Sequence, residues 1–122
     1  MKSLQATAYL SSLLGSDEVL TSDSDVILNV AKGKEWCLTI YCKLCDVNLL
    51  EKVREARWVD RTSIQFGSCL GKPTWWSLEE QGIVILVGSD TELWEVCVTI
   101  PLDEIEIFLN DLSNAPLELG FK

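Results

Sequence analysis

Residues 75–100 read WWSLEEQGIVILVGSDTELWEVCVTI, and in this segment strong strand formers alternate with turn formers. The aliphatic run at residues 83–87 lies between polar, glycine-containing turns at 79–82 and 88–91. Residues 93–100 then alternate apolar and mixed side chains until Pro101 ends the pattern. Such spacing is typical of three antiparallel strands that follow one another as a meander.

Further strands are expected upstream of this meander. Residues 25–31 and 36–42 each place alternate side chains on opposite faces, and the short turn at 32–34 joins them as a hairpin. Residues 62–66 alternate as another strand, and residues 67–73 are expected to form a loop. The sequence pattern therefore predicts about six strands in all.

Helices are expected at both ends of the chain. Apolar residues within 4–14 fall mainly at helical spacing, although an extended conformation at 6–9 is the alternative. Residues 46–58 fit a short helix whose end is already extended. A C-terminal helix is predicted over 102–113, ending before Pro116.

The length and pattern predict one α+β domain over residues 1–122, mainly β. Its antiparallel meander would curl as an open sheet or close into a small barrel, with the helices packed on it. A cupin-like barrel suits the number of strands, but the chain has no histidine to supply the usual cupin metal ligands.

The charge balance limits the classes of partner. The chain has 19 acidic and 10 basic residues, a net charge of −9. Nucleic acid is therefore not an expected partner, because phosphate binding requires a surface rich in Lys and Arg. A basic protein would instead be attracted by the long-range field.

The absence of histidine also limits the chemistry. It removes the commonest general base, the Ser-His and Cys-His pairs and the usual catalytic zinc site. No glycine-rich phosphate loop or nucleophile elbow is present. We therefore expect no catalytic residues and no cofactor, although other enzymes use carboxylates or lysines for catalysis.

Five cysteines, an odd number, lie mostly within apolar strand patterns. Free thiols in a reducing cytoplasm fit this count better than a disulfide framework. The apolar run at 4–14 contains polar residues and lacks a convincing cleavage site, so we do not expect a signal peptide. No stretch approaches the ~18 apolar residues of a membrane span. A soluble cytoplasmic protein without a membrane partner is expected.

Cys42 and Cys45 form a C-x-x-C pair between a strand and a potential helix. Residues 38–50 resemble the start of a glutaredoxin, and this resemblance implies a redox dithiol. The segment departs from that family because no aromatic residue or proline lies between the cysteines. Two structural cysteines are the other interpretation. A structural zinc site would need a second close pair, so no metal site is predicted.

The tryptophans are candidates for a binding face. The chain contains five, and tryptophan is enriched among the residues that contribute most to interface affinity. Trp75 and Trp76 must point to opposite faces of a strand, so one of them lies on the core side. We expect the other, with Lys72 in the adjoining loop, to bind a partner. The alternative is that the rings only fill the core.

A group of basic residues around Trp58 is a second candidate. Arg54, Arg57 and Arg61 would form a local positive patch for an anion or a carboxylate. Pairing of these arginines with neighbouring acidic residues is the alternative.

Together these features predict a non-catalytic protein-binding or regulatory module, most concretely an acidic inhibitor or immunity-type protein that covers a basic partner. A homodimer formed through the tryptophan-rich face fits the same features. The alternative from another class is a small-molecule-binding or enzymatic barrel without a histidine-ligated metal. A thiol redox protein based on Cys42 and Cys45 is the third.

Overall fold

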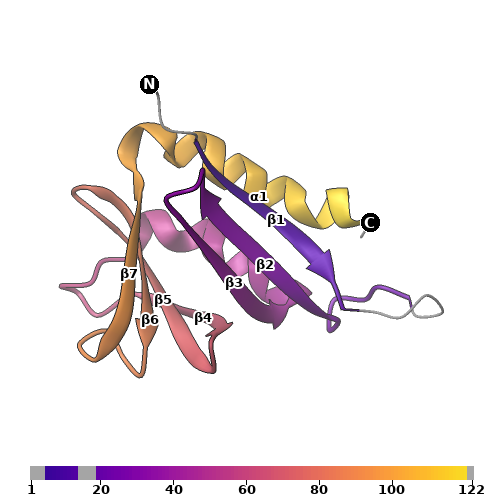
Figure 1. Cartoon of the computed structure of the whole chain (residues 1–122), viewed down its shortest axis with the longest axis horizontal. Helices are drawn as coiled ribbons and strands as arrows, with labels where there is room; N and C mark the ends of the chain where they lie inside the picture. Colours follow the sequence, from indigo (N-terminus) through magenta and orange to yellow (C-terminus); the bar gives the residue numbers. More distant parts are fainter. Residues whose placement is uncertain (1–4, 14–18, 121–122) are drawn as a thin grey trace.

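Seven strands follow one another in one antiparallel sheet, in the order in which they occur along the chain (Figure 1). The computed structural model describes residues 5–13 and 19–120. Its elements are β1 (Ala6–Ser12), β2 (Asp25–Lys32), β3 (Trp36–Lys43), the 3₁₀ helix η1 (Leu44–Glu55), β4 (Ile64–Cys69), β5 (Lys72–Glu79), β6 (Gly82–Gly88), β7 (Trp94–Pro101), the short 3₁₀ helix η2 (Leu102–Glu104) and the α-helix α1 (Ile105–Leu119). The predicted meander and C-terminal helix are confirmed.

The sheet is open. Within the described part of the chain, β1 pairs only with β2 and β7 pairs only with β6, so these two strands form the edges. The predicted curled sheet therefore does not close into a barrel, and a cupin-like shape is not confirmed.

The prediction of a helix near the N-terminus is wrong, because residues 6–12 form β1, a seventh strand. Ala6, Ala8 and Leu10 are buried, whereas Thr7 and Tyr9 between them are exposed. This period of two matches a strand with one buried face. The ends of the predicted helix, Leu4 and Leu14, lie outside the described residues.

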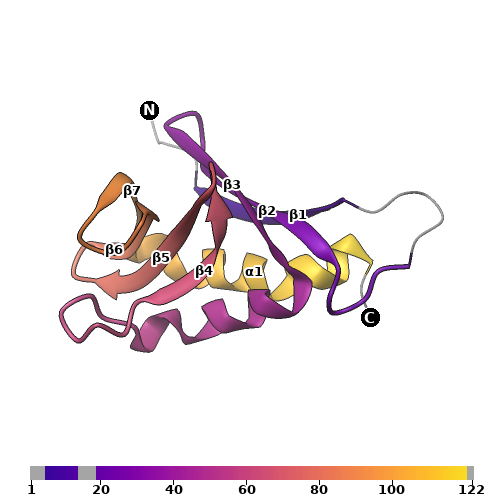
Figure 2. The same cartoon turned by 90° about the horizontal axis from the view of Figure 1, so that it is seen from below.

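The helices η1 and α1 lie side by side on one face of the sheet (Figure 2). In that layer η1 packs against β4 and β5, and α1 packs against β1. We call the face that they cover the inner face and the opposite one the outer face. None of the helices in the described part of the chain is long and apolar enough to cross a membrane.

The period of the buried residues explains the 3₁₀ conformation of η1, the segment that was expected to be a short helix from residue 46. Its buried side chains recur at every third position, at Leu44, Val47, Leu50 and Val53. A helix with three residues per turn aligns these side chains in one straight stripe, whereas an α-helix would rotate them progressively away from the sheet.

Helix α1 continues past Pro116, where the sequence predicted its end. Phe108, Leu112 and Ala115 form one buried stripe, which extends the packing of the helix beyond residue 113. The helix ends when Gly120 adopts a left-handed conformation (φ 106°) and its amide donates to Leu117 O. The stabilisation from burying this stripe thus outweighs the loss of the backbone hydrogen bond that proline cannot donate.

The segment expected to be a loop at 67–73 is mostly a hairpin. Gly67 forms a bulge at which the register of β4 and β5 shifts, and Leu70 and Gly71, both with positive φ, make the turn. A Cβ on Gly67 would lie 2.6 Å from Tyr41 O, so glycine permits the close approach of β3 and β4 here.

Trp76 joins the sheet to α1 in the core. Its ring is fully buried, packs edge-on against Phe66 at 5.9 Å and stacks on Phe108 at 6.2 Å between ring centroids. Its Nε1 donates to Thr74 Oγ1 at 2.9 Å, and that hydroxyl donates to Phe66 O. Every polar atom of this cluster is therefore satisfied without water.

A charged pair ties β1 and β2 to the start of α1. Lys32 Nζ donates to Glu104 Oε2 at 2.7 Å, and the Ala6 amide donates to Glu104 Oε1 at 2.6 Å. Burial alone would raise the pKa of Glu104, but the hydrogen bonds and the charge of Lys32 hold it below its ordinary value. The hydrogen bond to Glu104 raises the pKa of Lys32 against the opposing effect of burial.

We predict that Trp76→Ala destabilises the protein by about 3–5 kcal/mol, because it leaves a cavity between β5 and α1. Urea denaturation measures the loss. Tyr9→Ala, on the exposed outer face of β1, is the control and should cost no more than about 0.5 kcal/mol. Equal losses for the two variants would contradict the central place of Trp76.

The Lys32–Glu104 pair predicts a pH dependence. A carboxylate whose folded pKa is lowered adds stability above its unfolded pKa of about 4.3, and this stability is lost as the pH falls through the folded pKa. Glu104→Gln should therefore lower the melting temperature near neutral pH and by less in acid. Thermal melts across this pH range test it, and a parallel downward shift at every pH would contradict it.

Candidate functional site

The loop between η1 and β4 folds around the end of β5 and reaches the outer face of the sheet. The amide of Leu78 donates to Ala56 O at 2.9 Å, and the amide of Trp58 donates to Glu79 Oε2 at 2.8 Å. The indole Nε1 of Trp58 donates to Thr91 O at 3.3 Å. These bonds attach the loop to both β5 and the turn before β7.

Trp58 is held in place by a turn of its own loop. The Arg61 amide donates to Trp58 O at 3.0 Å, and the Thr62 amide donates to Arg57 O at 3.1 Å. The Arg57 amide in turn donates to Thr62 Oγ1 at 2.8 Å. The ring is nevertheless 45% exposed, so it is fixed before any partner arrives.

On the outer face, β5 and β6 supply an apolar floor. Ser77 pairs with Val84, and Trp75 pairs with Leu86, so these four side chains share this face. A register shift at Val87/Gly88 brings Trp94 opposite Gly88 at the start of β7. The ring of Trp94 is 48% exposed.

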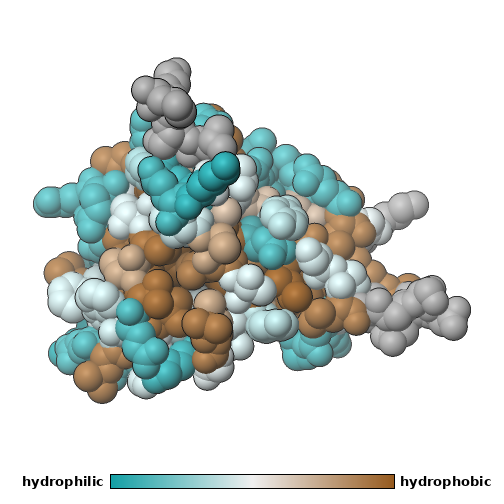
Figure 3. Space-filling model, viewed as in Figure 1, coloured by the Kyte–Doolittle hydropathy of each residue, from teal (hydrophilic) through white to brown (hydrophobic). Residues whose placement is uncertain are grey.

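Between the Trp58 loop and the edge strand lies a groove of about 870 Å³, which we call the tryptophan groove. It runs along β6, with Glu80 and Leu102 toward one end and Thr91 and Trp94 toward the other. Its apolar walls and floor are formed by Trp58, Val84, Leu86, Trp94 and Leu102, with Ser77 among them. Hydrophobic side chains also gather over the half of the molecule that carries β4–β7 in the view of Figure 3.

Ser77 is the polar exception on the floor. The residue is only 4% exposed, yet its hydroxyl is hydrogen-bonded to none of the described residues. Its oxygen is also not sealed inside the protein, because no fully enclosed polar atom of the described side chains lacks a partner. The groove thus has one nearly buried hydrogen-bonding group that is available to a ligand.

The charged groups at the groove are mostly acidic. Glu79 and Glu80 line it together with one basic residue, Arg57. The guanidinium of Arg57 donates to the carbonyl oxygens of Arg54 at 2.8 Å and Ala56 at 3.0 Å. Glu80 forms no ion pair with the described residues, so its carboxylate faces solvent.

The structure separates the two adjacent tryptophans of the sequence prediction. Trp76 belongs to the core and is not accessible to a partner. Trp75 lies half-buried on the outer face, where its Nε1 donates to Gly88 O at 3.1 Å. Lys72 lies at the start of β5 and pairs with Glu95 at 2.8 Å. Trp75 is therefore the member of this group that faces outward.

The three arginines around Trp58 do not form one patch. Arg57 lines the tryptophan groove, and Arg61 lies on the other side of the Trp58 loop, beside Trp75, Asp90 and Glu92. Arg54 points toward α1 and pairs with Glu106 at 2.8 Å. The three guanidinium groups of the predicted anion site therefore line different surfaces.

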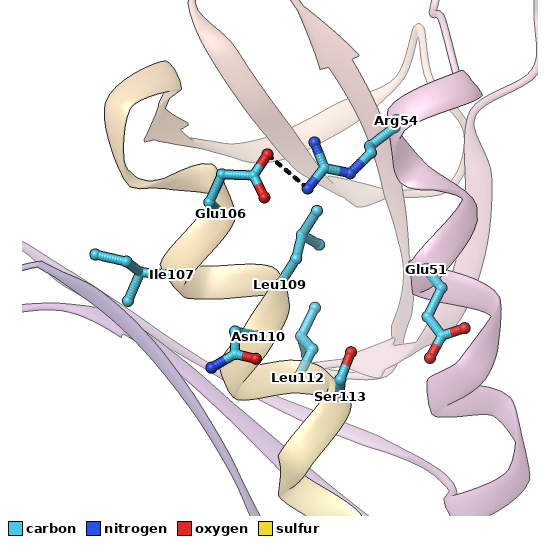
Figure 4. Close-up of a pocket in the computed structure, with 8 residues that line it drawn as sticks. All are labelled: Glu51, Arg54, Glu106, Ile107, Leu109, Asn110, Leu112 and Ser113. Atoms are coloured by element: carbon cyan, nitrogen blue, oxygen red, sulfur yellow. Dashed lines mark ion pairs between the residues drawn. The ribbon is translucent and has the colours of Figure 1, made fainter.

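The Arg54–Glu106 pair closes one end of a second groove, between η1 and α1 (Figure 4). Leu109 and Leu112 project into this groove, and Glu51, Asn110 and Ser113 surround them. Its charged pair is already formed within the protein, and its floor offers no polar group comparable to Ser77. We therefore regard the tryptophan groove as the stronger candidate site.

Several residues of the tryptophan groove were missed from sequence. Trp94 and Leu102 were assigned only to a strand and a helix, and Ser77 to a strand end. One signal was present: Ser77 is a small polar residue within an apolar segment, two residues before the acidic turn that leads into β6. Its convergence with Trp58 depends on the path of the loop, which no local pattern reveals.

The two cysteines of the C-x-x-C pair lie in different environments. Burial, followed by the negative charge of Asp46, raises the pKa of the Cys42 thiol to about 12. Cys45 is exposed, and its thiol lies 3.8 Å from Asp46 Oδ1. The nucleophilic thiol of a catalytic dithiol has a lowered pKa, and burial shifts the pKa of Cys42 in the opposite direction.

We predict that a thiol-alkylating reagent modifies the exposed Cys37 and Cys45 of the native protein well before the buried Cys42 and Cys69. Mass spectrometry of a time course gives the order of modification. In guanidinium chloride all five cysteines should react at similar rates. Rapid native modification of Cys42 would contradict its burial and its raised pKa.

The described residues contain no group of three or more Cys, Asp or Glu side chains that could hold a metal ion. No protein-family model, curated protein or solved structure matches this chain. The function proposed for the protein consequently depends on the chemistry of the tryptophan groove itself.

Proposed function

We propose that this protein is a non-catalytic binding module that holds a protein partner in the tryptophan groove. The observation that carries the proposal is the placement of two half-exposed indoles, Trp58 and Trp94, from separate elements beside one apolar floor. Tryptophans at the centre of a concave apolar surface are the usual anchors of a protein interface.

The rigidity of the Trp58 loop supports this proposal. Backbone and side-chain hydrogen bonds fix the loop to β5 and to the turn before β7. A preformed anchor binds more tightly because less conformational entropy is lost on association. A tryptophan with only a packing role would instead be expected inside the core, as Trp76 is.

The polar groups of the groove favour binding over catalysis. Glu79 accepts the Trp58 amide, and Arg57 donates to two backbone carbonyl oxygens. Both side chains thus have structural partners. No side chain of the described residues is hydrogen-bonded to Ser77, so this hydroxyl lacks the hydrogen-bonded general base that activates a serine nucleophile.

The net charge of −9 favours a basic partner, as in an acidic inhibitor or immunity-type protein. A second copy of the chain is a weaker candidate for the same groove, because it would bring like charges together. The five free cysteines support a cytoplasmic location for such a complex.

A small-molecule site is the second candidate function. The volume of about 870 Å³ falls within the range of about 300–1,000 Å³ that such sites occupy, and the floor is apolar with one polar group. A bound small molecule would be identified by native mass spectrometry of protein purified gently from its own cells.

We predict that the double variant Trp58→Ala/Trp94→Ala captures at least about tenfold less partner protein than the unmodified chain in quantitative affinity capture. The matched control is Tyr9→Ala/Tyr41→Ala, which removes two similarly exposed aromatic rings from the outer face of β1 and β3. This control should capture the same partner as the unmodified protein.

Circular dichroism should show that both double variants are folded. Capture of the same proteins in equal amounts by the groove variant would contradict the proposal. An equal loss with the tyrosine variant would place the binding surface outside the groove.

A further inference from the structure

We infer that the tryptophan groove binds an extended, cationic segment of the partner and that the Ser77 hydroxyl hydrogen-bonds to its backbone. This inference rests on the proposed function and specifies the chemistry of the partner. The features that carry it are the unpartnered hydroxyl on the floor, the period of the apolar floor and the free carboxylate at one end.

A ligand that covers the Ser77 hydroxyl must exchange a hydrogen bond with it deep in the groove. A hydroxyl both donates and accepts, and one that a ligand shuts off from water without offering a partner weakens the complex. Every residue of an extended segment carries a carbonyl oxygen, and every residue except proline carries an amide N–H. Such a backbone can satisfy Ser77 whatever side chains flank the contact.

The floor repeats with the period of a strand. Val84 and Leu86 are two residues apart on β6 and point into the groove, with Ser77 directly opposite Val84 on β5. An extended segment also presents alternate side chains to one side. The groove follows the seven residues of β6, roughly 20 Å, which matches about six extended residues.

The charges at the Glu80 end indicate a cationic segment. Glu80 is exposed and forms no ion pair within the described part of the chain, and Glu79 lies beside it. The basic residue of the groove, Arg57, is directed toward backbone carbonyl oxygens instead. A lysine or arginine next to the apolar residues of the partner would pair with Glu80.

The test uses synthetic hexapeptides, capped at both ends, with leucine at two alternate positions and lysine at both termini. Matched peptides carry glutamine or glutamate instead of lysine, or serine instead of leucine. Calorimetry on the full chain should rank the lysine peptide above the glutamine peptide by about two- to fivefold, and the glutamate peptide last. The serine peptide should bind about tenfold more weakly than its leucine parent.

Two single substitutions connect these affinities to the proposed contacts. Glu80→Gln should remove the preference for lysine over glutamine without changing the affinity for the glutamine peptide. Glu118→Gln, which changes the net charge equally at an exposed position in the last turn of α1, is the matched control and should preserve the preference.

Ser77→Ala separates a binding role from a structural one. The substitution should weaken every leucine peptide by about two- to tenfold, because the hydrogen bond to the backbone is lost. It should leave the melting temperature of the free protein unchanged or raised, because Ser77 has no hydrogen bond within the described structure to lose. A structural serine would show the opposite change in melting temperature.

Absence of binding by every peptide, equal affinities for the three charge types, or unchanged binding by Ser77→Ala would each overturn the inference. None of these results would contradict the proposed function, which is tested by the capture of a whole partner protein through Trp58 and Trp94. Failure of that capture experiment would contradict the proposed function independently.

Discussion

The packing of Trp76 between β5 and α1 determines how the rest of the chain is arranged. Its ring contacts Phe66 and Phe108, and its Nε1 donates to Thr74, so the apolar surface and the polar edge of the indole are both used inside the protein. Because successive residues of a strand point to opposite sides, this placement directs Trp75 and Ser77 to the outer face. Alternate side chains of β5 therefore contribute to the core on one face of the sheet and to the tryptophan groove on the other.

Sequence periodicity was sufficient for most of the sheet. The alternation in β2, β3 and β7 reflects one buried face, and the unbroken aliphatic run of β6 reflects burial on both faces. Burial is the main determinant of strand register. It was insufficient where tertiary packing outweighs local preference. The leucines between residues 4 and 14 fall at a helical spacing in the sequence, although residues 6–12 form β1. Pro116 is tolerated in α1 because Ala115 continues the buried stripe.

The candidate site was less predictable than the fold. Trp58 and Arg57 were recognised from composition, and Trp75 from its position in a strand. The convergence of Trp58, Ser77 and Trp94 depends on a loop that turns around the end of β5 and on a register shift at Gly88. The loop is held by hydrogen bonds to distant segments, and the register shift belongs to the turn between β6 and β7. Neither leaves a periodic signal in the sequence.

The position of α1 has a consequence for biosynthesis. Glu104, directly before this helix, binds the amide of Ala6, 98 residues earlier, and α1 packs on β1. β1 is synthesised long before the helix that covers it. Its buried side chains therefore lack their final packing partner until the last element of the described chain has been made.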